Sequence, residues 1–290
     1  MNEAAAGPLG RIDLHTHSCC SDGTLRPAEL VQLAAARGVT LLALTDHDTL
    51  AGLPEAQLAC AQHGIQFVPG VELSCHWQEV EIHVLGLGID ASANSLRSLC
   101  GEQRQRRQQR IEAIGKRLSA LGMPGSALAE KALQAAAPTR AHLAEGIRAR
   151  GFVASAQEAF DRYLAGGRPA FVSATWPALA TILQHILEAR GLAVLAHPHR
   201  YGLSGTRLGA LTQEFKRLGG AGIEISVAGM SPAKSAEAAR LARRFDLAGS
   251  LGSDFHQPGI PWRPLGRLVK LPEAVTPITA RLAQAHGPHH

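Results

Sequence analysis

The feature that most constrains the fold of this chain is a series of residue types that bind metals, each placed at or near the end of an apolar run. The first are His15 and His17, which follow the run at 12–14. Side chains alternate along an extended strand, so these two imidazoles point to the same face. With Asp22 close behind, they can form a corner of a metal site. An isolated pair of this kind is more often structural, so the interpretation depends on the rest of the chain.

Similar residues recur at later apolar runs: His47, Glu72, His83, His197, Asp254 and His256. Strands expected at 39–45, 65–71 and 81–89 alternate with helices expected at 27–37 and 52–63. This alternation indicates an α/β fold with parallel strands rather than a sandwich. In a barrel of parallel strands the strand ends gather at one face, where ligands carried on loops meet. The sequence therefore predicts an α/β barrel with one metal centre.

Five motifs, taken together and in this order, carry a resemblance to a known family: HTHSCCSDG at 15–23, TDHDT at 45–49, GVELS at 70–74, AHP at 196–198 and SDFH at 253–256. They resemble the PHP (polymerase and histidinol phosphatase) family of metal-dependent phosphoesterases, over about residues 11–90 and 190–260. Within the family, the chain is most similar to bacterial nucleoside 3′,5′-bisphosphate phosphatases, also described as 5′-to-3′ oligonucleotide-degrading ribonucleases.

The resemblance implies a distorted (β/α)7-type PHP barrel with two or three divalent ions. The implied ligand groups are His15, His17, Glu72 and Asp254 for the first ion, Glu72, His83 and His197 for the second, and Asp22, His47 and His256 for the third. Many members have histidine where this chain has Asp22. A carboxylate there suits Mn²⁺, which we expect, with Zn²⁺ or Fe²⁺ as alternatives. We interpret Asp46 as a partner that orients imidazoles and Asp48 as a turn or helix-start residue.

Two residues on the loop beyond His197 are candidates for catalysis. Arg200 can clamp a phosphate oxygen, and His199 can donate a proton to the leaving oxygen. A solvated loop would account for the same two residues, so both roles are hypotheses.

The middle of the chain has a different character. Residues 92–175 show helical periodicity without a convincing strand, so we expect a helical insertion domain in a barrel formed by 11–91 and 176–290. Residues 101–176 contain twelve basic and six acidic residues, a net charge of +6, and the rest of the chain carries −1. A localised basic excess suggests an anionic partner. The candidate substrate-binding residues are Arg104, Arg107, Thr139 and Arg140, although an arginine row on a helix is usually just solvated.

These features predict a metal-dependent phosphomonoesterase that removes the 3′-phosphate of nucleoside 3′,5′-bisphosphates by attack of a metal-bridging hydroxide. Short 5′-phosphorylated RNA is a further expected substrate. One alternative is a histidinol phosphate phosphatase, which the basic insertion disfavours because that substrate carries an amine. A proofreading-type exonuclease is disfavoured because no polymerase is attached. A third alternative is a metal-stabilised nucleic-acid-binding module without catalysis.

The cellular compartment expected for the protein follows from its cysteines and its apolar runs. The five cysteines are odd in number and lack the spacing of a disulfide framework, and no secretory signal precedes them. No apolar run approaches the roughly 18–20 residues of a membrane span. We expect a cytoplasmic protein with no membrane association and no obligate protein partner.

Overall fold

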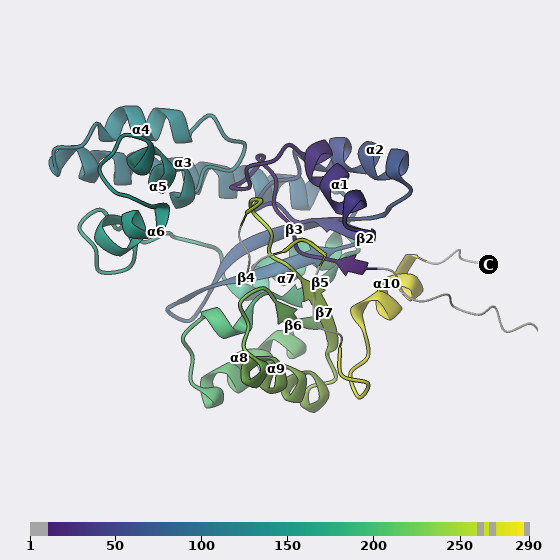
Figure 1. The fold of residues 1–290 in the computed structure, drawn as a ribbon. Coiled ribbons are helices and arrows are strands. Elements are labelled where there is room, and N and C mark those ends of the chain that lie inside the picture. Colours follow the sequence, from purple (N-terminus) through teal and green to yellow (C-terminus); the bar gives the residue numbers. More distant parts are fainter. Residues whose placement is uncertain (1–10, 260–263, 267–270, 287–290) are drawn as a thin grey trace, which may run out of the picture.

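A computed structural model describes residues 11–259, 264–266 and 271–286. Its centre is a seven-stranded sheet that follows chain order and curls into a nearly closed barrel (Figure 1). The strands are β1 (Arg11–Asp13), β2 (Val39–Leu44), β3 (Gln66–Trp77), β4 (Val80–Leu87), β5 (Leu192–Leu195), β6 (Gly222–Val227) and β7 (Ala248–Gly252). Just after β1, the N–H of Leu14 donates to the C=O of Leu251 in β7 (3.0 Å), and the N–H of His17 donates to the C=O of Phe255 beyond β7 (2.9 Å). The predicted α/β barrel is confirmed.

The expectation of parallel strands is wrong for β4. This strand is antiparallel to both β3 and β5, whereas the other neighbouring strands are parallel. Gln78 and Glu79 alone separate β3 from β4, and so short a connection joins antiparallel strands. Residues 71–77 alternate between apolar and polar side chains, which is why β3 continues through Glu72 instead of ending before it.

The helices fall into two sets. Around the barrel lie α1 (Pro27–Ala36), α2 (Leu53–His63), α7 (Leu179–Glu188), the 3₁₀ turn η2 (Pro198–Arg200), α8 (Gly205–Arg217), α9 (Pro232–Arg244) and α10 (Ile278–His286). Between β4 and α7 the chain forms α3 (Asn94–Ala120), α4 (Gly125–Ala132), α5 (Arg140–Ala149), α6 (Ala156–Ala159) and the π-helix η1 (Phe160–Leu164). Helices α5, α6, α8 and α9 each begin after a serine or threonine whose hydroxyl accepts a hydrogen bond from a backbone N–H of the first turn. Ser231, for example, accepts a hydrogen bond from the N–H of Lys234 at the start of α9.

The strands divide their apolar side chains between two hydrophobic clusters. Leu42 and Leu44 pack against the surrounding helices, whereas Ala43 between them faces the barrel interior. The interior cluster also contains Ile278 and Leu282 of α10, which lies against the beginnings of β6 and β7. One end of the barrel is therefore covered by α10, and the opposite end, where the parallel strands finish, is left for polar side chains.

A third hydrophobic cluster fills the helical lobe, which we define as α3 to η1, residues 94–164 (Figure 1). Between residues 92 and 170, all of which the structure describes, no strand occurs. Helix α3 belongs to both cores: Leu96 and Leu99 pack in the barrel cluster, and Ile111 and Ile114 pack in the cluster of the lobe. This single helix of 27 residues thus joins the lobe to the barrel.

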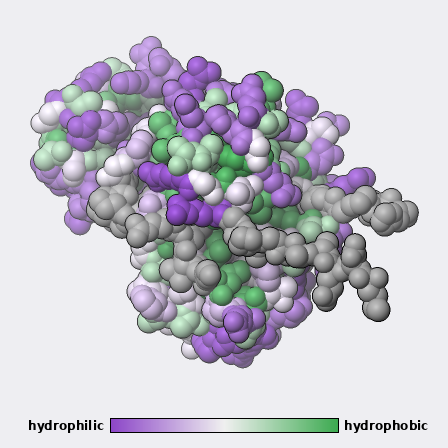
Figure 2. All heavy atoms as spheres, turned by 45° about the vertical axis from the view of Figure 1, so that its right-hand side comes forward, coloured by the Kyte–Doolittle hydropathy of each residue, from purple (hydrophilic) through white to green (hydrophobic). Residues whose placement is uncertain are grey.

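Some sequence expectations concern parts of the chain outside the described residues. The sequence indicates a short arm at 1–10 and a tail segment at 265–270 that would help to finish the barrel, and of these only residues 265 and 266 are described. Among the described residues, no helix is both long enough and apolar enough to span a membrane. The face seen in Figure 2 mixes hydrophilic and hydrophobic residues, with hydrophilic ones predominating at its edges.

Candidate metal centre

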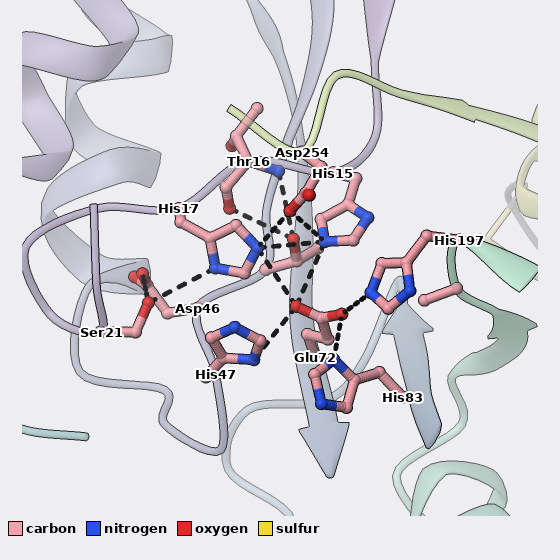
Figure 3. A network of polar contacts seen from close by, with 12 residues as sticks. His15, Thr16, His17, Ser21, Asp46, His47, Glu72, His83, His197 and Asp254 are labelled. Carbon is pink, nitrogen blue, oxygen red and sulfur yellow. Dashed lines mark hydrogen bonds and ion pairs between the residues drawn. The ribbon is translucent and has the colours of Figure 1, made fainter. Parts of the chain in front are cut away.

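The predicted ligands come together at the open end of the barrel. His15, His17 and Asp22 follow β1, His47 follows β2, Glu72 lies within β3, His83 lies within β4, His197 follows β5, and Asp254 and His256 follow β7. Figure 3 shows the imidazoles turned toward one another around the carboxylate of Glu72. Glu72 and His83 share a site because β3 and β4 are neighbouring antiparallel strands.

Glu72 is fully buried and lies at the centre of the cluster. Its Oε2 atom lies 3.2 Å from Nε2 of His15, 3.1 Å from Nε2 of His17 and 3.1 Å from Nδ1 of His47, and its Oε1 atom lies 2.9 Å from Nδ1 of His83 and 2.8 Å from Nε2 of His197. A carboxylate with each oxygen aimed at a different set of imidazoles is suited to bridge two cations.

Three overlapping groups of side chains have the spacing of metal ligands: His15, His17, Glu72 and Asp254; His47, Glu72 and His83; and His17, Asp22, His47 and His256. The first group has the membership expected from the sequence. The second group was expected to contain Glu72, His83 and His197. In the structure His47 groups with Glu72 and His83 instead, and His197 contacts the carboxylate of Glu72. In the third, His17 is added to the expected residues. His17 and His47 each lie between two groups, so the sites form one continuous cluster.

The atoms facing one another in this cluster fit a cation. His15 Nδ1 lies 3.0 Å from Glu224, which places the proton on that nitrogen and leaves the lone pair on Nε2. This Nε2 is 3.0 Å from Nε2 of His17, between oxygens of Glu72 and Asp254. Glu72 Oε2 is buried without a hydrogen bond. Two ring nitrogens and two carboxylate oxygens, all converging, form the donor set of a hard or borderline divalent ion.

The carboxylates and imidazoles of the cluster shift one another's pKa values. Burial alone would raise the pKa of Glu72, but the surrounding imidazoles, led by His47, hold it well below its usual range. Burial lowers the pKa of His83, yet the charge of Glu72 outweighs this and raises the pKa to about 10. For His17, close contacts with the carboxylates of Asp254 and Glu72 outweigh burial and raise the pKa to about 9. Protons on these rings occupy the lone pairs that a bound cation would take.

Glu224 is a member of the site that the sequence analysis missed. It is fully buried in β6, where its Oε2 accepts a hydrogen bond from the N–H of His197 (2.6 Å) and its Oε1 faces His15. Gly252 gives it room, because a Cβ there would lie 2.2 Å from the Cβ of His15 and 2.7 Å from Glu224 Oε1. A lone glutamate inside an otherwise buried strand, GIEISV, was the available signal.

Tyr201 is a second residue that the sequence analysis missed. Its hydroxyl donates to the C=O of Ala196 (2.5 Å) and accepts from the N–H of His83 (3.1 Å). It therefore fastens β4 to the end of β5, and its ring lies against that of His197. The backbone at His197 (φ 25°) and Asp254 (φ 51°) has the left-handed conformation that non-glycine residues rarely adopt, so surrounding contacts must hold these two candidate ligands in place.

Asp46 acts through serines rather than directly on an imidazole. It accepts hydrogen bonds from the N–H (2.7 Å) and hydroxyl (2.6 Å) of Ser18 and from the hydroxyl of Ser21 (2.6 Å). Ser21 in turn lies 3.4 Å from Nδ1 of His17. The loop between His17 and Asp22 is thus fixed by a buried carboxylate on the neighbouring strand end.

The two candidate catalytic residues lie in η2 beside the cluster. Arg200 forms an ion pair with the Oδ2 atom of Asp254, and its side chain remains 29% exposed. His199 is half-buried in the same turn. The structure therefore brings Arg200 to the candidate metal ligand Asp254, with part of its guanidinium still open to solvent.

The four candidate substrate-binding residues are placed differently from one another. Arg104 is exposed. Thr139 caps α5 by accepting from the N–H of Ala141. Arg140 lies over the rings of Phe160 and Phe171. Arg107 is buried, and Asp48 engages its guanidinium through Nε (2.8 Å) and Nη2 (2.6 Å).

A barrel that gathers histidines and carboxylates at one end, with arginines beside them, is the arrangement of a metal-dependent hydrolase acting on an anion. The PHP domain family matches residues 13–165, and the chain belongs to this family. Its fold and site are those of a PHP-type metal-dependent phosphoesterase.

Proteins similar to this chain over most of its length include named phosphoesterases. A 5′-3′ exoribonuclease of Haemophilus influenzae is 41% identical over 268 residues, covering 92% of this chain and 97% of that protein. A 3′,5′-nucleoside bisphosphate phosphatase of Chromobacterium violaceum is 38% identical over 276 residues, covering 94% and 97%. A solved C. violaceum structure described as an amidohydrolase with bound sulfate has a TM-score of 0.89 at 38% identity, covering 95% and 96%. A metal-dependent phosphoesterase structure from Bifidobacterium adolescentis has a TM-score of 0.79 at 26% identity, covering 96% and 97%.

Proposed function

We propose that this phosphoesterase is a phosphomonoesterase that removes the 3′-phosphate of nucleoside 3′,5′-bisphosphates, with short 5′-phosphorylated RNA as a second substrate. The observation that carries the proposal is a group of arginines beside the metal cluster. Glu81 links the two: its Oε1 lies 4.0 Å from Nε2 of His83 and 3.7 Å from Nη1 of Arg110. A substrate with one phosphate at the cluster would have a second anion within reach of these arginines.

The arginine group carries more positive charge than its partners neutralise. Burial, together with the charges of Arg140 and Arg107, lowers the pKa of Arg110 to about 10. Nη2 of Arg110 is buried without a hydrogen bond, and so is Nε1 of Trp176, whose ring lies beneath the guanidinium. Donors of this kind favour an anionic ligand. Arg110 therefore joins Arg140 and Thr139 as a proposed contact of the second phosphate, while Arg107 is already paired.

At the reacting phosphate, Mn²⁺ ions held by the cluster would activate water and neutralise the phosphoryl oxygens. Arg200 would hold a phosphoryl oxygen with the part of its guanidinium that Asp254 does not engage. His199 would donate a proton to the 3′ oxygen as the bond from phosphorus to that oxygen breaks and the bond to the attacking water forms. No covalent intermediate with the protein is required.

Two further expectations accompany this proposal. Histidinol phosphate remains the alternative substrate, and its amine would have to approach Arg110 and Arg140, which disfavours it. The five cysteines are free thiols, which fits a reducing compartment, so we place the activity in the cytoplasm.

The test is phosphate release from a panel in the presence of Mn²⁺. The panel contains a nucleoside 3′,5′-bisphosphate, a 2′,5′-bisphosphate, nucleoside 3′-monophosphates, histidinol phosphate and a 5′-phosphorylated trinucleotide. We expect the 3′,5′-bisphosphate to have the highest kcat/KM. Preference for histidinol phosphate would replace the proposal with the alternative, and tight RNA binding without phosphate release would favour a binding module.

Arg140→Ala sharpens this test. A charge-assisted contact with phosphate contributes about 1.5–3 kcal/mol, so kcat/KM for the bisphosphate should fall roughly 10- to 100-fold. A nucleoside 3′-monophosphate has no second phosphate and should lose little. Arg148→Ala is the matched control, because Arg148 lies on the same helix in an exposed pair with Glu145. Equal losses on both substrates would assign Arg140 to the reacting phosphate or to the fold.

A further inference from the structure

Asp48, the residue after the ligand His47, is the centre of a buried polar contact between the barrel and the helical lobe. It is 1% exposed and has a left-handed backbone (φ 49°). Its Oδ2 accepts from Nε (2.8 Å) and Nη2 (2.6 Å) of Arg107. Its Oδ1 accepts from the N–H of Ser74 (2.9 Å) and from Nε2 of Gln103 (3.2 Å). Four donors thus surround one carboxylate that water does not reach.

The lobe supplies its half of this contact from one face of α3. Gln103 is fully buried and Arg107 is 6% exposed, and they lie one helical turn apart. Both reach β3 as well, since Gln103 Nε2 donates to the C=O of Ser74 (2.7 Å) and Arg107 Nη2 to its hydroxyl (3.0 Å). The Trp176 ring lies 5.1 Å from the Arg107 guanidinium and covers it. The guanidinium of Arg107 is therefore engaged by protein groups and is not positioned to bind a ligand.

Every anchor of this contact adjoins a metal ligand. Asp48 follows His47, and its N–H donates to the C=O of Glu72 (2.9 Å). Ser74 lies two residues beyond Glu72 and pairs with His83 in the register of β3 and β4. His47, Glu72 and His83 form one of the three ligand groups and lie together in Figure 3. The contact therefore touches the backbone that carries each member of this group.

We propose that Arg107 and Gln103 are positioning residues that act through Asp48 and Ser74, so that docking of α3 and assembly of the His47–Glu72–His83 group are one coupled event. Thermodynamic coupling is reciprocal, so metal binding at this group should also tighten the docking of α3. Without Arg107, the buried carboxylate of Asp48 would keep its hydrogen bonds from Ser74 and Gln103 but lose its opposite charge, a costly state that movement of the turn after His47 would relieve. The inference concerns metal binding, and it rests on the proposed function only for its effect on turnover.

The experiment measures Mn²⁺ affinity and stoichiometry of the metal-free protein by electron paramagnetic resonance of free Mn²⁺, together with thermal unfolding with and without Mn²⁺. In Arg107→Met we expect at least one site to lose roughly 10- to 100-fold in affinity, and the rise in Tm on adding Mn²⁺ to shrink. Arg107→Lys keeps the charge and should recover part of the affinity. Arg106→Met is the control, since the neighbouring Arg106 forms an exposed pair with Glu102 and its loss should change neither quantity.

Other results would overturn the inference. A lower Tm of the metal-free protein with unchanged Mn²⁺ affinity would make the contact purely structural. Unchanged metal binding with a raised KM for the bisphosphate alone would make Arg107 a substrate ligand. If Arg107→Met does not fold, Gln103→Leu leaves both charges in place and should still weaken Mn²⁺ binding, and unchanged affinity in that variant would overturn the inference. The metal titration uses no nucleotide, so a wild-type chain that binds Mn²⁺ but hydrolyses no bisphosphate refutes only the proposed function.

Discussion

Glu224→Gln tests whether a residue that contacts no ion in the proposed arrangement controls metal affinity. The carboxylate serves two ligands at once, facing Nδ1–H of His15 (3.0 Å) and accepting from the N–H of His197 (2.6 Å). A glutamine of the same shape has one accepting oxygen, so its amide group would face a donor at the other position. One charge-assisted hydrogen bond is lost, worth about 1.5–3 kcal/mol, and Mn²⁺ affinity should fall roughly 10- to 100-fold.

The assay is competition for Mn²⁺ with a fluorescent chelator, read beside thermal unfolding of the metal-free protein. Glu237→Gln is the control, because Glu237 pairs with Lys234 on the outer helix α9 that follows β6, and its loss should leave Mn²⁺ affinity unchanged. Wild-type affinity in Glu224→Gln would refute the argument that Glu224 fixes the lone pair of His15. A lower Tm without a change in affinity would assign Glu224 to the fold alone.

Three further predictions follow from the site. Glu72→Gln should lose at least one ion and nearly all turnover, and metal analysis showing full occupancy with normal activity would contradict the bridging role. Gly252→Ala places a Cβ 2.2 Å from that of His15 and should destabilise the protein by about 1–3 kcal/mol in thermal unfolding, whereas Gly209→Ala, with nothing within 4 Å, should not. Because the pKa of His17 is raised to about 9, metal binding at pH 7 should release protons and weaken as the pH falls. Calorimetry in two buffers with different ionisation heats measures that release, and none is expected if the ring is already neutral.

The metal cluster was accessible to sequence reasoning because each ligand type recurs at an apolar run, and the structure brings all nine together. What escaped were features set by tertiary contacts. A lone glutamate in a buried strand signals that Glu224 has a polar partner, but only the placement of β6 shows that its partners are His15 and His197. Arg107 belongs to a periodic row of arginines, and only the docking of α3 distinguishes it from the exposed Arg104. The antiparallel direction of β4 was not predicted, because the two residues of the turn between β3 and β4, Gln78 and Glu79, are not residue types typical of tight turns.

The register between β4 and β5 bears on how this barrel could be re-engineered. Leu87 and Leu192 are paired across the two strands, so the whole excursion between them leaves and re-enters the barrel at adjacent points. Segments with neighbouring ends are the ones most readily exchanged between proteins. A graft of a foreign lobe would nevertheless need its junction beyond Arg107, because the first turns of α3 and their hold on Asp48 belong to the barrel's own machinery. A graft joined before residue 94 removes Arg107 and should bind less manganese than a graft joined after residue 110, although both present the same foreign surface.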